Sequence, residues 1–333
     1  PRSNLSRRTR HAAVPGALPL KDNTPKNMAA SVRDRLYNLA QHDNRDFNLV
    51  LTAFATERLL YRLSCSEYAD RFVLKGARLF SLWSHRPHRP TRDLDLLGYG
   101  DSSADALREA FQAICRTEVE PDGLTIDEDT MTIEEIRLEQ EYEGQRIKLV
   151  VRLGQARIPL QIDVGFGDVV TPEVQMMEYA PLLDTLPAPR IRAYTRESVI
   201  AEKFQAMVAL GALNTRMKDF YDICALAGEF DYDGQTLCDA IQATFRRRKT
   251  PVPAELPLCL QPAFGKDEDR QHLWKAFLTR SASQDISTDD FATALGKIRD
   301  FLGPPMLAAS REKAVFHSSW LAGKGWQAKE TAD

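Results

Sequence analysis

Residues 91–100, with the sequence TRDLDLLGYG, constrain the fold more than any other segment of the chain. Leu94 and Leu96 alternate with Asp93 and Asp95, and this period of two predicts a β-strand with one apolar and one polar face. Both carboxylates then point to the same side of the strand, where their charges repel each other. A divalent cation such as magnesium would relieve that repulsion. The alternative interpretation is a strand face that water solvates.

A third carboxylate follows further along the chain. Asp163 lies in a predicted strand over 157–164, and its apolar neighbours Ile162 and Val164 belong to the opposite face. Two acids that hold cations, with a third that orients or deprotonates a hydroxyl, are the arrangement that in-line phosphoryl or nucleotidyl transfer needs.

A glycine turn precedes the two aspartates. Apolar residues over 72–74 predict a short strand, and Lys75 and Gly76 lead from it into a helical turn over 77–83. Backbone N–H groups at such a turn can receive a phosphate.

The rest of the chain divides into a mixed region and a helical region. Ser31 is the expected N-cap of a first helix that ends near Leu39, and Thr195 caps a helix to about Leu210. The other predicted elements are helices over 45–63, 104–116, 215–227, 271–279, 289–302 and 307–316, and strands over 131–142 and 146–153. This order predicts an α/β catalytic half followed by an α-helical half.

The net charge of -3 conceals segments of opposite sign. The first 30 residues form a basic arm of net charge +5, residues 117–145 hold eleven acids against one arginine, and residues 186–220 carry a net charge of +3. A near-neutral total therefore does not exclude a nucleic-acid substrate.

Two further features indicate the compartment. No run of 18 apolar residues is present, so we expect neither a membrane span nor, because Pro15 and Pro19 interrupt the N-terminal stretch, an export signal. The five scattered cysteines fit neither a disulfide framework nor a zinc site, which favours a cytoplasmic protein.

Five segments, FVLKGARLFSLW, RPTRDLDLLGYG, IDVGFGD, ESVIAEKFQAM and RMKDFYDI, resemble in order and spacing the AbiEii toxin family of nucleotidyltransferases, to which the mycobacterial MenT toxins belong. The resemblance extends from about residue 27 to 300. It implies a DNA polymerase β-like nucleotidyltransferase core with a mixed sheet, followed by an α-helical domain.

Residues 1–27 are poor in periodic apolar side chains, so we expect them to form a disordered basic arm, and we expect a disordered tail over 321–333. Between these ends, the resemblance implies the nucleotidyltransferase core with its leading helices over 28–190 and the helical domain over 191–320. The implied activity is the transfer of a nucleotide, often a pyrimidine, from an NTP to the 3′ acceptor end of tRNA, which blocks aminoacylation and translation in a bacterial cytoplasm. An antitoxin encoded by a neighbouring gene would restrain the enzyme.

Site residues follow from the resemblance position by position. The implied catalytic residues are Asp93, Asp95, Asp163, Lys203 and Asp219, of which the first three would bind Mg²⁺, or Mn²⁺ in its place. The implied NTP-binding residues are Lys75, Gly76, Thr91, Arg92, Lys203 and Asp222. The chain departs from the family at Ala77, where a hydroxyl that could contact a phosphate is missing.

Other interpretations stay open for several of these residues. Lys203 could belong to a solvated helix face, and Asp222 could pair with Arg216 or Lys218. The basic run Arg246, Arg247, Arg248 and Lys249 is either a solvated helix end or a contact for the tRNA backbone. For the whole chain, the alternatives are an enzyme, nucleotidyltransferase or kinase-like, that modifies a protein or small molecule, and a non-catalytic nucleotide- or RNA-binding module.

Overall fold

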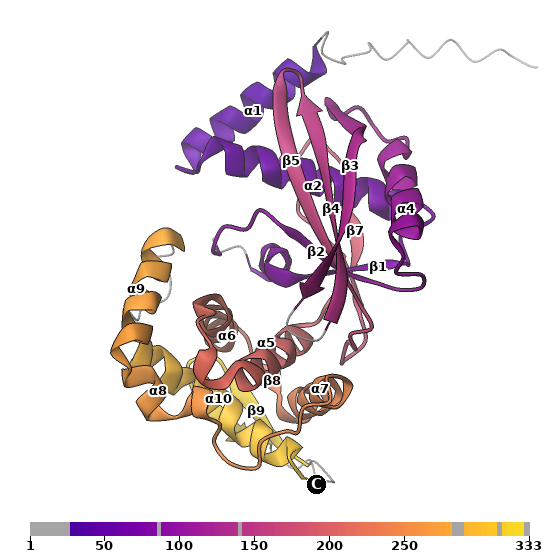
Figure 1. The fold of residues 1–333 in the computed structure, drawn as a ribbon. Helices are drawn as coiled ribbons and strands as arrows, with labels where there is room; N and C mark the ends of the chain where they lie inside the picture. The colour runs from indigo at the N-terminus through magenta and orange to yellow at the C-terminus, as the bar shows by residue number, and fades with distance from the viewer. Residues whose placement is uncertain (1–26, 85–87, 139–141, 282–289, 312–314, 330–333) are drawn as a thin grey trace, which may run out of the picture.

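The computed structural model describes residues 27–84, 88–138, 142–281, 290–311 and 315–329. These residues form a large mixed sheet with helices and, after it, a mainly helical half (Figure 1). The α/β architecture that the sequence predicts is thereby confirmed. No helix among the described residues is long and apolar enough to span a bilayer.

Seven of the described strands form one sheet in the order β3-β4-β5-β2-β1-β7-β6. Their bounds are β1 Phe72–Lys75, β2 Leu94–Gly98, β3 Leu124–Leu138, β4 Tyr142–Leu153, β5 Ala156–Phe166, β6 Gln175–Glu178 and β7 Arg190–Ala193. Strands β3, β4 and β5 are an antiparallel meander, whereas β2 runs parallel to β5 and antiparallel to β1. The parallel pair is what makes the sheet mixed.

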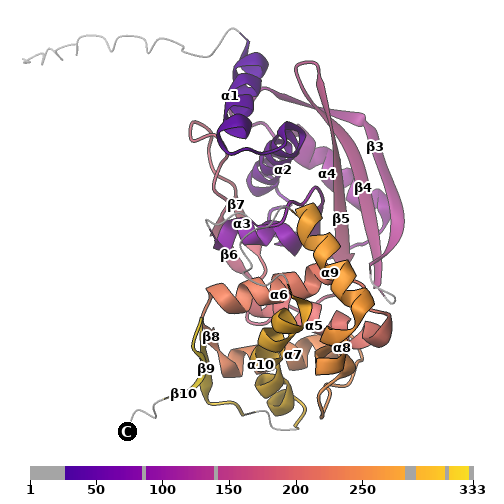
Figure 2. The ribbon, with the colours of Figure 1, turned by 90° about the vertical axis from the view of Figure 1, so that its left-hand side faces the viewer.

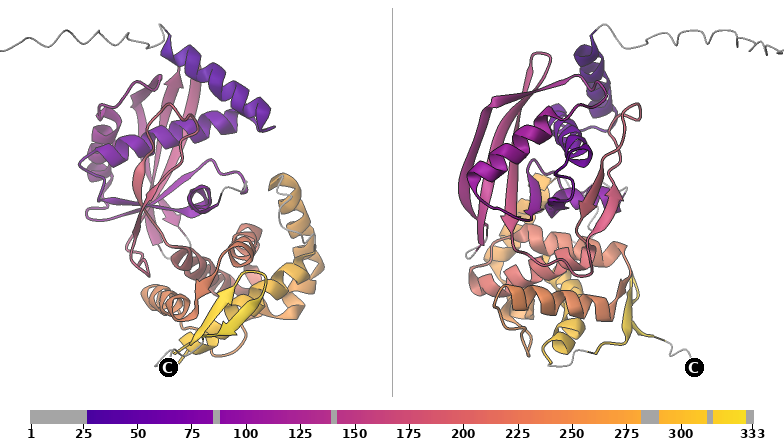
Figure 3. Two further views of the ribbon diagram at one scale, coloured as in Figure 1. Left: turned by 180° about the vertical axis from the view of Figure 1, so that it is seen from behind. Right: turned by 90° about the vertical axis from the view of Figure 1, so that its right-hand side faces the viewer.

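Helices cover one face of this sheet (Figure 3). They are α1 Met28–His42, α2 Phe47–Cys65 and α4 Ala104–Arg116, while a 3-10 turn Gly76–Leu79 and the short α3 Phe80–Trp83 follow β1. The 13 residues of α4 match the predicted helix over 104–116, because its apolar side chains recur at helical spacing and Leu107, Phe111 and Ile114 are buried.

The second half is a helical bundle that lies below the sheet in Figure 2. Its elements are α5 Arg196–Leu210, α6 Met217–Glu229, α7 Gly234–Arg247, α8 Pro262–Lys266, α9 Glu268–Ser281 and α10 Phe291–Ala309, with 3-10 turns Gly211–Leu213 and Leu258–Leu260. A small sheet of β8 Tyr232–Asp233, β9 Ser318–Leu321 and β10 Gly325–Ala328 closes it.

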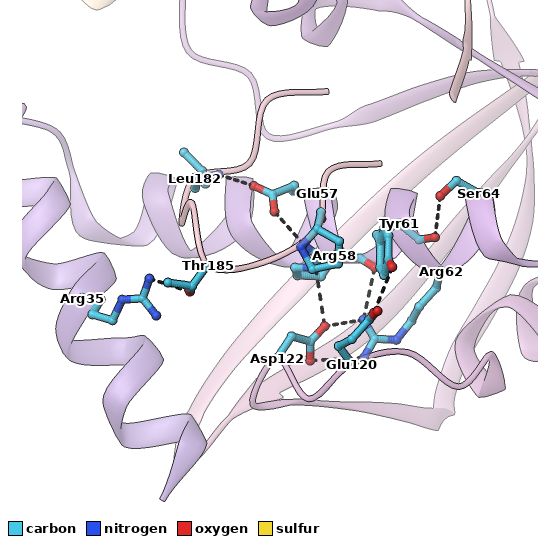
Figure 4. A network of polar contacts seen from close by, with 11 residues as sticks. Arg35, Glu57, Arg58, Tyr61, Arg62, Ser64, Glu120, Asp122, Leu182 and Thr185 are labelled. Carbon is cyan, nitrogen blue, oxygen red and sulfur yellow. Dashed lines mark hydrogen bonds and ion pairs between the residues drawn. The ribbon is translucent and has the colours of Figure 1, made fainter. Parts of the chain in front are cut away.

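A buried polar network connects α2 to two loops (Figure 4). Glu57 accepts hydrogen bonds from the backbone N–H of Leu182 at 2.7 Å and from Arg58 at 3.2 Å. Arg62 donates to both oxygens of Asp122, at 2.6 and 3.2 Å. Burial raises the pKa of Glu57 to about 7 in spite of these partners. Asp122 belongs to the acidic segment 117–145, so part of that segment is structural.

Three predicted boundaries are wrong. The first helix begins at Met28 because the Asn27 side chain accepts the N–H of Ala30 at 3.0 Å, so Ser31 is not its cap. Strand β3 begins at Leu124, earlier than the predicted 131. Only the first part of the predicted helix over 307–316 is helical, as the end of α10, which continues through Pro304 and Pro305 and stops at Ala309; residues 312–314 lie outside the described residues.

The expected disordered tail over 321–333 is also incorrect for its described part. Residues 325–328 form β10, which pairs with β9. Trp326 donates its indole N–H to the carbonyl of Phe301 at 3.0 Å, and the two rings stack 6.0 Å apart. Aromatic packing therefore orders a segment whose composition alone predicted disorder. The basic arm, apart from Asn27, lies outside the described residues.

Candidate active site

The parallel pairing of β2 with β5 brings the acidic strands together. Asp95 lies opposite Asp163 in the register of this pair, and Asp93 is exposed immediately before β2. The three carboxylates line a cavity of about 400 Å³ between the sheet and the helical half. The predicted site residues that line this cavity are Lys75, Gly76, Thr91, Asp93, Asp95, Asp163, Lys203 and Asp219.

Gly76 and Asp95 fit against each other closely. Gly76 has a φ of +75°, and a Cβ at this position would lie 2.0 Å from Oδ2 of Asp95. Glycine is therefore required both by the backbone conformation and by the space that the carboxylate occupies. Burial, followed by the nearby charges of Asp163 and Asp93, raises the pKa of Asp95, although Lys75 opposes the change. This carboxylate is thus held where negative charge is unfavourable without a cation.

Asp163 has a partner in this structure. Arg146, its register neighbour on β4, donates two hydrogen bonds of 2.8 Å, one to each carboxylate oxygen. No three His, Cys, Asp or Glu side chains among the described residues are arranged to hold a metal ion. The predicted three-carboxylate metal site is therefore not assembled. The carboxylate oxygens of Asp93 and Asp95 are nevertheless the kind of ligand that Mg²⁺ prefers, and a cation would stabilise the buried negative charge of Asp95.

Lys75 belongs to a charged cluster that the sequence did not predict. Its Nζ lies 2.9 Å from Asp168 and 3.6 Å from Glu202. Burial lowers the pKa of Lys75, but these two carboxylates outweigh it and the pKa is raised. Asp168 and Glu202 also line the cavity. Asp168 is the last residue of the segment IDVGFGD, so its place in that segment was the signal that could have identified it.

The basic run at the end of α7 contains one buried residue and three exposed ones. Arg248 is only 5% exposed; it donates to Gln205 at 2.9 Å and lies 3.3 Å from Asp168. The guanidinium of Arg248 is thus held by other protein groups, and its contact with the RNA backbone stays a prediction. Arg246, Arg247 and Lys249 are exposed.

Lys203 points into the cavity and is held by two acids of α6. Its Nζ lies 2.9 Å from Asp219 and 2.8 Å from Asp222, and Arg216 contacts the other oxygen of Asp219 at 2.7 Å. Burial lowers the pKa of Lys203, and the two aspartates more than reverse this effect. The interpretation of Lys203 as a solvated helix residue is excluded.

Asp222 lies behind the cavity and does not line it. Its side chain is fully buried, and its oxygens accept two hydrogen bonds of 2.8 Å from Arg89 and contact His88 at 2.9 Å. Burial would raise the pKa of Asp222, but Lys203 and Arg89 bring it well below its usual value. The predicted direct contact of Asp222 with the NTP does not fit this position; Asp222 positions Lys203 and Arg89.

The segment before β2 is fixed by side chains rather than by secondary structure. Buried Arg78 donates to the backbone carbonyls of Asp93 at 3.2 Å and of Arg92 at 3.3 Å. Arg92 itself is exposed and does not line the cavity, whereas Thr91 and Arg89 do. The sequence had assigned the phosphate-binding role to Arg92, and Arg89 was not identified.

The sheet presents acids on adjacent strands beside a glycine turn, and a following helix supplies a lysine. This combination is typical of a nucleotidyltransferase. Residues 58–297 match the sequence model of the family described as nucleotidyl transferase AbiEii toxin, type IV TA system. The chain belongs to this family, as its sequence segments predicted, and is a nucleotidyltransferase.

Two solved structures from Helicobacter pylori are similar. JHP933 is 15% identical with a TM-score of 0.41, and the alignment covers 78% of this chain and 92% of JHP933. A candidate nucleotidyltransferase is also 15% identical, with a TM-score of 0.38 and coverage of 78% and 95%. No curated protein gave a significant match.

Proposed function

We propose that this chain is a magnesium-dependent toxin that transfers a nucleoside monophosphate, a pyrimidine in the expected case, from an NTP to the 3′ acceptor end of tRNA. The observation that carries the proposal is the shared cavity, which Asp93, Asp95, the turn glycine Gly76 and Lys203 line together. The modified tRNA could not be aminoacylated, so translation would stop. Membership of a toxin–antitoxin family supports an antitoxin partner, and the cytoplasm as the place where the two proteins meet is part of this proposal.

The residues of the cavity supply the parts of an in-line transfer. The 3′ hydroxyl oxygen of the acceptor attacks the α-phosphorus, and the bond from this phosphorus to pyrophosphate breaks. Asp163 accepts the proton of the hydroxyl group after the ion pair between Asp163 and Arg146 has opened. Lys203 stabilises the negative charge that develops on the leaving pyrophosphate. Asp93 and Asp95 would hold Mg²⁺, which when bound neutralises phosphate charge.

Labelled NTPs test this function directly. The purified chain is incubated with each of the four labelled NTPs, magnesium and total tRNA, and the label in tRNA is measured. We expect incorporation from at least one NTP, loss of it with EDTA, and loss of it in Asp93→Ala. Asp129→Ala is the matched control because Asp129 is exposed on β3 and does not line the cavity.

Two results would contradict the proposal. One is the absence of label in tRNA with all four NTPs. The other is an Asp93→Ala variant that is as toxic in cells as the wild type. Label that enters protein or a small molecule instead would support the alternative acceptors, and only a polyanionic acceptor should show a steep fall of activity with salt.

A further inference from the structure

A second cavity of about 600 Å³ adjoins the catalytic one. Phe166 and Arg248 line both cavities. The second cavity lies among the start of α4, Glu135 of β3, Gln145 of β4, and the end of α7 with the residues after it, where Arg247 and Lys249 line the cavity. The two cavities therefore meet at Phe166 and Arg248, so an RNA strand bound in the second cavity can extend past these two residues toward the first.

Gln145 gives this cavity an unsatisfied polar group. Its side chain is 9% exposed, and its Oε1 is buried without a hydrogen-bond donor in the described part of the chain. A buried acceptor left unpaired costs about 1–3 kcal/mol, so such groups in native proteins usually have a partner. Because Gln145 lines the cavity, a ligand donor can satisfy it there.

The neighbouring residues indicate what that donor is. Glu135 lies opposite Gln145 in the β3–β4 register and also lines the cavity. A carboxylate beside an amide oxygen offers two acceptors, which matches the exocyclic amino group of cytosine or adenine. The ring of Phe166 offers a surface on which a base can stack, a contact worth about 1–3 kcal/mol.

The remaining wall suits a phosphate backbone. Arg247 and Lys249 are exposed at the cavity, and Arg247 also donates to the carbonyl of Gly167 at the end of β5. Positive groups beside a stacking ring are the usual combination in sites for single-stranded nucleic acid.

We propose that this second cavity binds a nucleotide of the acceptor RNA strand whose base carries an exocyclic amino group, with Gln145 and Glu135 reading the base and Lys249 contacting the backbone. This inference rests on the proposed function, because it assigns a place to the acceptor of that reaction.

Binding without chemistry tests the subsite. In the Asp93→Ala background, fluorescence anisotropy measures the affinity of the full chain for short single-stranded RNAs that end in cytidine or in uridine. We expect the cytidine RNA to bind more tightly, and Gln145→Leu to weaken it about tenfold and remove the preference, since a lost hydrogen bond to a buried group costs about 1–3 kcal/mol.

A second pair of variants does not depend on the buried glutamine. Lys249→Gln should reduce the slope of log affinity against log salt by about 0.7, the value for one phosphate contact on a single strand. Arg157→Gln is the matched control, because Arg157 is exposed at the opposite end of β5 from Phe166. Its slope should equal that of the parent chain.

Kinetics separate the possible failures. With the otherwise wild-type chain, Gln145→Leu should raise the KM for RNA and leave the KM for NTP unchanged. A raised KM for NTP alone would overturn the proposal and assign the cavity to the donor base. If Gln145→Leu and Lys249→Gln both bind RNA as tightly as the parent chain while tRNA is still labelled, the subsite is overturned and the proposed function stands. If the wild type labels no tRNA, the proposed function itself is overturned.

Discussion

Arg146 on β4 and Asp163 on β5 form a bidentate ion pair, with both hydrogen bonds 2.8 Å long. The pair lies at the edge of the catalytic cavity and occupies the oxygens that the sequence assigns to a metal. Arg146 thus competes with any cation for Asp163.

Removal of this competitor should strengthen metal binding. We expect Arg146→Gln to bind Mn²⁺ about tenfold more tightly in an EPR titration, because a charge-assisted hydrogen bond contributes about 1.5 kcal/mol and 1.4 kcal/mol corresponds to tenfold. Arg152→Gln is the control, since Arg152 is on the same strand and pairs with Asp127 at 2.9 Å outside the cavity. Equal Mn²⁺ affinity in both variants would show that the pair does not compete.

A methyl group at Gly76 should abolish activity. The added Cβ would lie 2.0 Å from Asp95 Oδ2, so the carboxylate or the turn must move. Gly100→Ala separates this clash from backbone strain, because Gly100 has a φ of +84° and no atom within 4 Å of its added Cβ. Both variants should lose about 1–2 kcal/mol of stability from the left-handed conformation, and only Gly76→Ala should lose nucleotidyl transfer. Full activity in Gly76→Ala would refute the argument.

Asp222 should stabilise the fold in a pH-dependent manner. Its folded pKa lies well below its usual value of 3.8, so its stabilising effect is complete above the unfolded pKa and is lost as the pH falls through the folded pKa. We expect Asp222→Asn to cost about 3–5 kcal/mol at pH 7, because it leaves Lys203 and Arg89 short of a buried partner. Urea unfolding should show a smaller difference from the wild type at pH 3 than at pH 7; a constant difference would contradict this account.

The pKa of Glu57 is shifted in the opposite direction, so its effect on stability has the opposite dependence on pH. Its pKa rises from 4.5 to about 7 on folding, so the folded state binds the proton more tightly and stability falls as the pH rises between these values. The full change is about 3 kcal/mol as an upper figure. Glu57→Gln should remove this decline when urea unfolding is compared at pH 5 and pH 8. Exposed Glu118, changed to Gln, should leave the decline as it is in the wild type.

Two arginines at the end of α7 differ in burial, so their removal should affect stability differently. Arg248→Ala should lower the unfolding temperature, because it removes the buried donor to Gln205 and one of the two cations that contact Asp168. Exposed Arg246→Ala should leave the unfolding temperature within about 1–2 °C of the wild type, since exposed substitutions usually change stability by less than 0.5 kcal/mol. Thermal unfolding of the two variants measures the difference, and equal temperatures would contradict it.

Local patterns in the sequence predicted the elements that local physics determines. The strand over 72–74, the helix over 104–116 and the cap at Thr195, whose hydroxyl accepts the N–H of Ser198 at 3.4 Å, are all confirmed. Each depends on periodicity or on a capping side chain within a few residues.

Contacts between residues that are distant in the sequence could not be predicted from such local patterns. Nothing near Asp163 indicates that Arg146 pairs with it, because the pairing follows from the strand register. The ordering of β10 depends on Trp326 meeting Phe301 on a different element. Asp168 and Arg248, which follow β5 and α7, form a contact that appears only after the two halves pack. The sequence thus predicted Asp163 and Asp222 but not Arg146 and Arg89, the arginines that hold them.

The position of β2 between β1 and β5 has a consequence for synthesis. The ribosome makes β2 well before β5, and Lys203 and Asp219 emerge later still. Pairing between segments this distant in the chain forms late in folding. A nascent or truncated chain therefore lacks Lys203 and Asp219 of the candidate site until α5 and α6 have been synthesised.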